Sequence, residues 1–183
     1  MKIYIIGPSC VGKTRLGDIL AKEFKVGAHI DLDLCFNDFE TIRTGVVGFK
    51  NAEEGKKEYM KKVKGMDSWV VEGVFPVKEA FEEADKIILI KYWALFPLFF
   101  QWKRFFTDKW QRDTYGFKSN LWLSGDILRQ YFSRKDNDFD NPLSFTVRKY
   151  SKLLKLYEGK SIKVNSPHDL NVLINNWKIL SKD

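Results

Sequence analysis

The chain has 183 residues, of which 44% are hydrophobic and 30% are charged, and its formal net charge is +7. This size and composition are typical of one soluble globular domain, and the basic balance suits an anionic partner. The longest apolar run, residues 87–102, is interrupted by Lys91 and Pro97 and is shorter than the ~20 residues of a spanning helix, so we expect no membrane partner.

The two cysteines, Cys10 and Cys35, form no C-x-x-C pair and have no histidines at metal-ligand spacing. This pattern excludes a disulfide framework and a zinc site and favours a reducing compartment. No signal-peptide pattern precedes the first predicted strand. We therefore expect a cytoplasmic protein, as a monomer or a homodimer.

Predicted strands and helices alternate along the chain. Short apolar runs predict strands at residues 2–6, 28–32, 69–72, 86–90 and 161–164. Apolar side chains at helical spacing predict helices at residues 13–24, 52–63, 78–83, 97–112, 121–132, 142–157 and from 167 onward. Ser166 and Asp169 fit a capping box around Pro167 as the first helical residue. Because the strands are apolar throughout, we predict an α/β fold with a parallel sheet covered on both faces.

The segment between the first strand and the first helix reads GPSCVGKT and matches the phosphate-binding pattern G-x-x-x-x-G-K-[S/T]. Glycines in such a loop let successive N–H groups converge on a phosphate, and the helix start adds its positive dipole end. In this pattern the lysine reaches the β- and γ-phosphates and the threonine hydroxyl binds Mg²⁺. The predicted nucleotide-binding residues are Gly7, Pro8, Ser9, Cys10, Val11, Gly12, Lys13 and Thr14.

Two aspartates end the second predicted strand, which reads HIDLD. Asp31 and Asp33 are two residues apart and would point the same way from an extended strand. One carboxylate would orient an acceptor hydroxyl or accept its proton, and the other would hold Mg²⁺ through water. The alternative is a loop in which the aspartates only cap a helix.

The third predicted strand ends in WVVEG, an apolar run that leads into a carboxylate. This is the shape of the second P-loop NTPase motif, whose acid ligates Mg²⁺ indirectly. Glu72 is therefore a predicted metal and substrate residue, and Gly73 would allow a substrate to approach the backbone.

Basic residues are concentrated between residues 99 and 135, where eight of them stand against three acidic ones. On one continuous helix, Arg104 and Arg112 would project from the same face with Asp108 between them. Catalysis of phosphoryl transfer needs cations near the donor, so we interpret residues 97–141 as a lid. The alternative is a solvent-exposed, salt-bridged helix face.

The order of these parts resembles the adenylate-kinase-related P-loop kinases, and in particular the group described as DNA topology modulation proteins. The shared features are the N-terminal P-loop, HIDLD, WVVEG, Ala84-Asp85 before an apolar strand, and R-x-x-x-R-like arginines after it. The resemblance implies a three-layer P-loop fold with a five-stranded parallel sheet in the order 2-3-1-4-5, a helical lid, ATP and Mg²⁺. The resemblance implies that Gly12, Lys13 and Thr14 bind phosphate. It also implies that Asp33 or Asp31 acts as a base or binds the substrate, and that Arg104 and Arg112 are residues of the lid.

Adenylate kinases follow the D-G of their third strand with F-P-R, whereas this chain reads Glu72-Gly73-Val74-Phe75-Pro76-Val77 and has no arginine there. AMP is therefore not the expected acceptor. We expect a single domain with a substrate-binding insert at about residues 34–66. The predicted function is transfer of the γ-phosphoryl group of ATP to a small-molecule or nucleotide acceptor. The alternative is a nucleotide-binding regulator linked to nucleic acid, suggested by the aromatic and basic residues of the lid segment.

Overall fold

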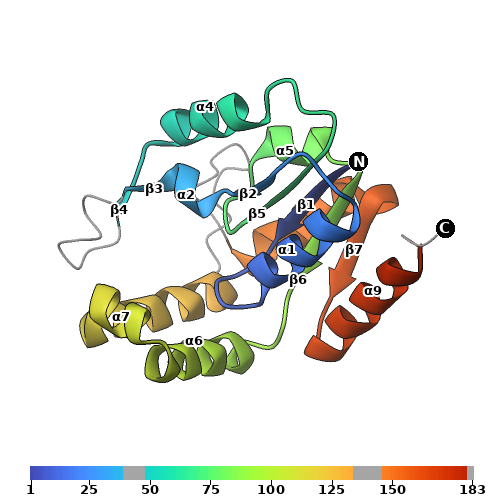
Figure 1. The fold of residues 1–183 in the computed structure, drawn as a ribbon. Coiled ribbons are helices and arrows are strands. Elements are labelled where there is room, and N and C mark those ends of the chain that lie inside the picture. Colours follow the sequence, from blue (N-terminus) through green and yellow to red (C-terminus); the bar gives the residue numbers. More distant parts are fainter. Residues whose placement is uncertain (39–47, 134–145, 181–183) are drawn as a thin grey trace.

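The computed structural model describes residues 1–38, 48–133 and 146–180. Within these residues, a central sheet of five parallel strands has the order β2-β5-β1-β6-β7 (Figure 1). Its strands are β1 (Lys2–Ile6), β2 (His29–Asp31), β5 (Trp69–Gly73), β6 (Lys86–Ile90) and β7 (Ser161–Val164). Counted along the chain within this sheet, the order is 2-3-1-4-5, which confirms the predicted topology.

Helices connect the strands and flank the sheet. They are α1 (Lys13–Glu23), α2 (Asp33–Phe36), α4 (Ala52–Val63), α5 (Lys78–Glu83), α6 (Leu95–Thr107), α7 (Lys109–Phe132), α8 (Val147–Leu156) and α9 (Pro167–Leu180), with a 3-10 turn at Glu158–Lys160. The segment predicted as an insert also contains two short antiparallel strands, β3 (Asn37–Asp38) and β4 (Gly48–Phe49).

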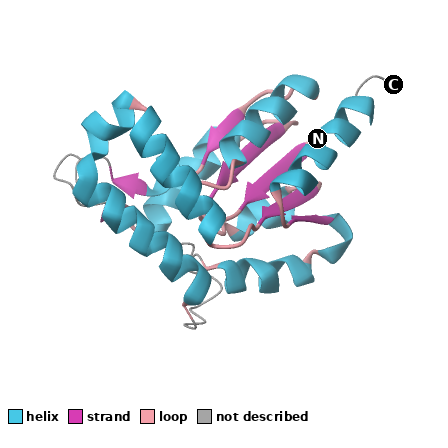
Figure 2. Ribbon diagram, turned by 90° about the horizontal axis from the view of Figure 1, so that it is seen from below, coloured by secondary structure: helices cyan, strands magenta, loops and turns pink. Residues whose placement is uncertain are grey.

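The sheet has a hydrophobic core on each face, because alternate residues of its apolar strands point to opposite sides. Tyr4 of β1 is fully buried in a cluster with side chains of α4, α5 and α8, and its ring contacts Phe81 edge to face. Its neighbours Ile3 and Ile5 are buried on the other face with Leu16 of α1 and other side chains of α1 and α9. The ribbon seen from below shows helices on both sides of the strands (Figure 2). The predicted three-layer α/β architecture is thereby confirmed.

Three helix starts differ from the prediction, and one of them is that of α7, which begins at Lys109 and not at residue 121. Helix α6 begins at Leu95, so Pro97 lies within its first turn, where a backbone N–H has no intrahelical partner and proline is tolerated. Helix α8 begins at Val147 and not at residue 142, because the Thr146 hydroxyl caps it by accepting a hydrogen bond from the backbone N–H of Lys149. The predicted loop at 134–141 lies outside the described residues.

The start of α9 agrees with the predicted capping box. The Ser166 hydroxyl accepts a hydrogen bond from the backbone N–H of Asp169 at 3.1 Å. The Asp169 carboxylate accepts in return from the backbone N–H of Asn165 at 3.0 Å, one residue before the expected partner.

Helices α6 and α7 occupy the segment predicted as a lid and lie side by side, away from the strands (Figures 1 and 2). The buried side chain of Gln101 joins them by donating to the backbone carbonyl and the side-chain oxygen of Asn120, at 2.9 and 3.0 Å. Gly116, with φ of 61° and ψ of 176°, interrupts α7 near its start. The pair is therefore held by buried polar contacts and by aromatic packing, in which the ring of Phe117 lies against Trp102 and Phe105.

Candidate active site

The predicted phosphate-binding loop connects the carboxyl end of β1 to the start of α1. Two of its residues have left-handed φ angles, 61° at Cys10 and 89° at Gly12. A Cβ at Gly7 would lie 2.3 Å from the backbone oxygen of Ile90, so only glycine lets the loop lie against the end of β6. No side chain caps α1, which leaves the first N–H groups of the helix for an anion.

Lys13 is the first residue of α1, and its side chain is buried. Only 6% of the residue is exposed, and its ammonium donates a 2.9 Å hydrogen bond to the backbone oxygen of Pro8. Burial raises the pKa of Cys10, Asp33 and Glu72, and the positive charge of Lys13 opposes the rise in each. Lys13 therefore acts electrostatically on the loop and on two carboxylates at once.

Thr14 and Glu72 meet across the loop. The Thr14 hydroxyl donates a 2.7 Å hydrogen bond to Oε1 of Glu72, which is 1% exposed near the end of β5. Burial raises the pKa of Glu72 to about 7, and the negative charge of Asp31 adds to the rise. Asp31 pairs with Glu72 in the register of β2 and β5, which explains the coupling. The two predicted Mg²⁺ residues are thus direct neighbours.

Asp31 and Asp33 do not lie on one extended strand, so that part of the prediction is wrong. Strand β2 ends at Asp31 and α2 begins at Asp33, and Oδ1 of Asp31 accepts a 2.8 Å hydrogen bond from the backbone N–H of Asp33. This contact is an Asx turn, so Asp31 has the turn-capping role that the alternative interpretation assigned to both aspartates.

Asp33 instead reaches the residues after β5. Its Oδ1 accepts a 2.9 Å hydrogen bond from the backbone N–H of Val74, and no described residue donates to Oδ2. Burial raises the pKa of Asp33 to about 6, the positive charge of Lys13 opposes the rise, and Asp31 adds to it. Oδ2 is therefore the carboxylate oxygen that can accept a proton.

Gly73 serves contacts within the chain. A Cβ there would lie 2.7 Å from Cβ of Leu32 and 3.0 Å from Oδ1 of Asp33. The close approach that we predicted for a substrate is made here by the turn between β2 and α2.

The predicted pairing of Arg104 and Arg112 on one helix face is wrong. Helix α6 ends at Thr107, and Asp108 has extended angles, φ of −103° and ψ of 107°. Aspartate is favoured immediately before a helix, and α7 begins at the next residue. Arg112 therefore belongs to α7, and its side chain lies outside the described part of the structure.

Arg104 lies on α6 with 59% of its side chain exposed, at 3.9 Å from a carboxylate oxygen of Asp108. This confirms the Arg104–Asp108 contact of the salt-bridge alternative. Burial raises the pKa of Cys10, and the positive charge of Arg104 is among the influences that oppose the rise. The charge of Arg104 thus acts on Cys10 in the predicted phosphate-binding loop.

Sequence reasoning missed Gln130 of α7, which carries no motif. Gln130 is fully buried, and its Oε1 accepts a hydrogen bond of 3.4 Å from the backbone N–H of Ser9. Its Nε2 donates to Asp126 at 2.6 Å, and Asp126 also pairs with Arg129. Helix α7 therefore contacts the predicted phosphate-binding loop directly.

Two buried tyrosines, also missed, hold the segment after β5. The Tyr150 hydroxyl donates to the backbone oxygen of Val74 at 2.6 Å, and the Tyr4 hydroxyl donates to the backbone oxygen of Phe75. Tyr150 thus fixes Val74, whose backbone N–H positions Asp33, and Tyr4 fixes the next residue.

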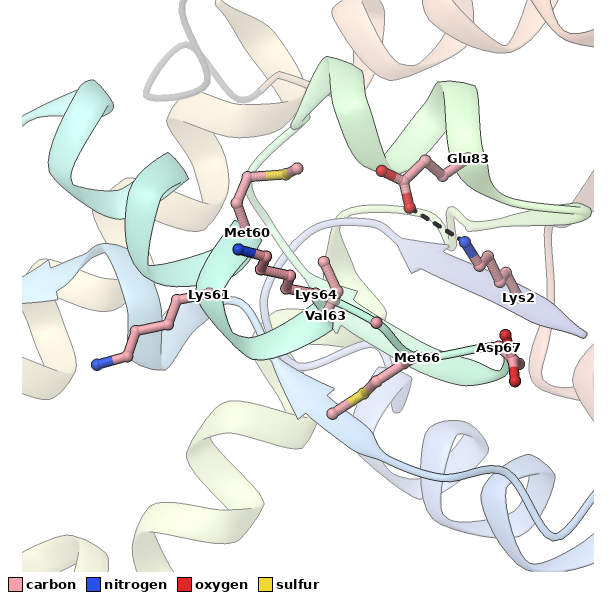
Figure 3. A pocket seen from close by; sticks show the side chains of 9 residues that line it. Lys2, Met60, Lys61, Val63, Lys64, Met66, Asp67 and Glu83 are labelled. Atoms are coloured by element: carbon pink, nitrogen blue, oxygen red, sulfur yellow. Dashed lines mark hydrogen bonds and ion pairs between the residues drawn. The ribbon is translucent and has the colours of Figure 1, made fainter.

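A pocket of about 630 Å³ lies elsewhere, beside the amino end of β1 and the last turn of α4 (Figure 3). Lys2 and Glu83 form an ion pair of 3.3 Å at its rim, and Met60 and Val63 supply apolar surface. It contains none of the predicted site residues, so the candidate site rests on the loop and the strand ends.

The sequence matches no protein-family model and no curated protein. Among solved structures, it is similar to shikimate kinase from Bacteroides thetaiotaomicron, with 14% identity, a TM-score of 0.49 and coverage of 100% of this chain and 99% of that one. It is also similar to shikimate kinase from Acinetobacter baumannii in complex with shikimate, with 15% identity, a TM-score of 0.47 and coverage of 99% and 93%. These are likenesses of overall fold.

Proposed function

We propose that this chain is an ATP-dependent phosphotransferase that transfers a γ-phosphoryl group to a hydroxyl or phosphate acceptor held near Asp33. The observation that carries the proposal is the convergence of Lys13, Thr14, Glu72 and Asp33 at the carboxyl ends of β1, β2 and β5. This edge is where ligands bind in open parallel sheets.

The residues present fit Mg²⁺. Thr14 and Glu72 supply oxygen donors, which are the ligands that Mg²⁺ prefers. Among the described residues, no three His, Cys, Asp or Glu side chains form a metal-holding group. Mg²⁺ usually takes only one or two protein carboxylates and completes its shell with water and phosphate oxygens. When bound, it neutralises negative charge on the transferred phosphoryl group.

The chain's own residues have separable roles in this proposal. The N–H groups of the Gly7–Gly12 loop and the start of α1 bind the phosphates, and Lys13 places its positive charge beside them. Oδ2 of Asp33 accepts the acceptor's proton, while its Oδ1 stays fixed by the N–H of Val74. Arg104, and Arg112 by prediction, supply positive charge from the lid.

The alternative, a regulator linked to nucleic acid as in the DNA topology modulation group, is not favoured. The regulator alternative rests on composition and motif order alone. It assigns no role to the buried carboxylates of Asp33 and Glu72 beside the loop. The acceptor class is open to nucleoside monophosphates, sugars, other alcohols and hydroxy acids, with AMP not expected.

The test is ATP turnover by the purified chain with Mg²⁺ against a panel of these acceptors. Lys13→Ala is the blank, and Lys22→Ala, in the last turn of α1, is the matched control. We expect one acceptor to raise ADP formation far above the Lys13→Ala level, with Lys22→Ala unchanged. Turnover equal to the Lys13→Ala level under all conditions, together with no ATP binding, would overturn the proposal.

A further inference from the structure

Helices α6 and α7 carry large apolar side chains that point to solvent. We call this set the lid apolar face; it consists of Leu95, Phe99 and Phe106 from α6 and Phe117, Leu121 and Leu128 from α7. Phe99, Phe106 and Phe117 are 61%, 62% and 61% exposed. Contiguous exposed apolar surface of this kind marks an interaction site.

The face is continuous from one helix to the other. The ring of Trp102 stacks on Phe106 and lies against Phe117, with centroids 5.8 Å apart in both pairs. Residues 95, 99 and 106 recur at helical spacing on α6, as do 117, 121 and 128 on α7. Gln101 of α6 is buried against Asn120 of α7, and the buried ring of Phe105 contacts Phe106 and Phe117 edge to face. The lid apolar face therefore adjoins the surface that joins the helices, and Phe106 and Phe117 remain more than half exposed there.

Positive charge borders this face. Lys103 of α6 and Lys118 of α7 are exposed, as is Lys109 at the junction of the helices. The acidic groups Asp108 and Asp126 lie within ion-pair distance of Arg104 and Arg129, and none of the three lysines forms an ion pair with a described residue. Two copies packed through this face would bring lysines together, whereas an anionic surface is complementary to it.

We propose that the lid apolar face docks the protein onto the surface of an anionic lipid bilayer. Phe, Trp and Leu on one side of a helix with lysines beside them are the features of helices that lie in the membrane interface. No described helix is long and apolar enough to cross a membrane. The contact that we propose is interfacial, a kind of contact that the expectation of no membrane partner, which concerned a spanning helix, did not consider. Single-stranded nucleic acid fits less well, because Leu95, Leu121 and Leu128 of this face cannot stack on bases.

The test is sedimentation of the full chain with phosphatidylcholine vesicles, with and without about one-third phosphatidylglycerol. We expect the anionic vesicles to bind at least about tenfold more tightly, since each nearby lysine contributes about tenfold or less at low salt. Raising the salt from about 0.05 to about 0.5 M weakens this preference. Tryptophan emission shifts to shorter wavelength on binding, because the ring of Trp102 packs against Phe106 and Phe117 of the face.

Phe99→Ser/Phe106→Ser is the test variant, and Leu156→Ser, on α8 with 72% exposure, is the matched apolar control. Lys103→Glu/Lys118→Glu is compared with Lys57→Glu/Lys155→Glu, at exposed positions of α4 and α8. Both lid variants should reduce vesicle binding at least about tenfold, with far-UV circular dichroism unchanged and both controls as wild type.

Three results would overturn the proposal. One is the absence of binding to anionic vesicles. Another is vesicle binding that the Phe99→Ser/Phe106→Ser variant retains. The third is evidence that the lid apolar face binds another partner and not vesicles. This would be a dimer in sedimentation equilibrium, or binding of a single-stranded oligonucleotide, that the Phe99→Ser/Phe106→Ser variant loses, in a protein that does not bind vesicles.

Discussion

The hydroxyl of Thr14 donates to Oε1 of Glu72 at 2.7 Å and so joins the first turn of α1 to the end of β5. Glu72 is buried with Asp31 and Asp33 near it, and its pKa is raised to about 7. Protonation of Glu72 thus eases the repulsion between acidic groups in the ligand-free protein. A bound cation would favour the ionised form instead.

Glu72→Gln should stabilise the metal-free protein and impair its turnover. The folded-state pKa of Glu72 is raised, so its contribution to stability is present below its ordinary pKa and is lost as pH rises through about 7. In EDTA at about pH 8, we expect the variant to melt several degrees above wild type, and at about pH 5 the two should converge. Mg²⁺-dependent ATP turnover should fall at least about tenfold.

The control is Glu82→Gln, whose side chain is 55% exposed on α5 and which should leave both measurements unchanged. A melting temperature of Glu72→Gln that is lower than wild type at about pH 8 would contradict the electrostatic account of this site.

Asp33→Asn should remove the proton acceptor and leave nucleotide binding intact. We expect phosphoryl transfer to slow by about 10²- to 10⁴-fold, with the affinity for ATP changed less than about threefold in calorimetry. Because the pKa of Asp33 is about 6 and the base must be ionised, the wild-type rate should fall as pH drops below about 6. Asp67→Asn, at an exposed position beside the pocket in Figure 3, is the matched control. A variant that kept the wild-type rate would exclude Asp33 as the base.

The fold was largely predictable because the strands are apolar and short. The bounds predicted for β1, α5, β6 and β7 agree with the structure. A buried parallel strand needs apolar side chains on both faces, so its ends show as the first charged or turn residue. The placement of Lys13 and Thr14 followed from the glycine motif for the same local reason.

The incorrect predictions arose where the regular spacing of residues in the sequence continues past the end of a strand or a helix. Alternation in HIDLD does not mark the end of β2 at Asp31, because an Asx turn keeps the same residue spacing. The helical spacing of Arg104 and Arg112 likewise persists across Asp108, although the helix does not. The role of Gln130 could not be predicted from the sequence, since it depends on a tertiary contact with Ser9 and a single glutamine forms no recognisable motif.

Arg104→Ala should lower turnover at saturating ATP by at least about tenfold, because its charge acts on the loop from the lid. Its ion pair with Asp108 is exposed, so the free energy of unfolding should change by less than about 1 kcal/mol. Steady-state kinetics and urea unfolding measure the two effects. Arg148→Ala, at an exposed position of α8, is the control, and equal turnover in both variants would remove Arg104 from the proposed machinery.

Gln130→Ala should loosen the contact between α7 and the phosphate-binding loop. The loss of a buried side chain that bonds both Ser9 and Asp126 should cost about 1–3 kcal/mol in urea unfolding. If α7 positions the loop, the KM for ATP should rise more than kcat falls. A variant that is destabilised but keeps its KM would show that Gln130 serves the fold alone.

Gly73→Ala tests whether the turn between β2 and α2, which carries Asp33, requires the absence of a side chain at position 73 in β5. The new Cβ would lie 2.7 Å from Cβ of Leu32 and 3.0 Å from Oδ1 of Asp33, so the turn must shift. We expect a loss of about 1–3 kcal/mol in urea unfolding and a lower rate of phosphoryl transfer, because the displaced carboxylate is the proposed base.

Gly125→Ala is the matched control for that substitution. It lies exposed in α7, where a Cβ would meet no described atom within 4 Å, and alanine should stabilise the helix by about 0.5–1 kcal/mol. The two variants add the same methyl group and should change stability in opposite directions. If Gly73→Ala unfolded like wild type, the turn would be free to move, and the position of Asp33 would not depend on its contact with β5.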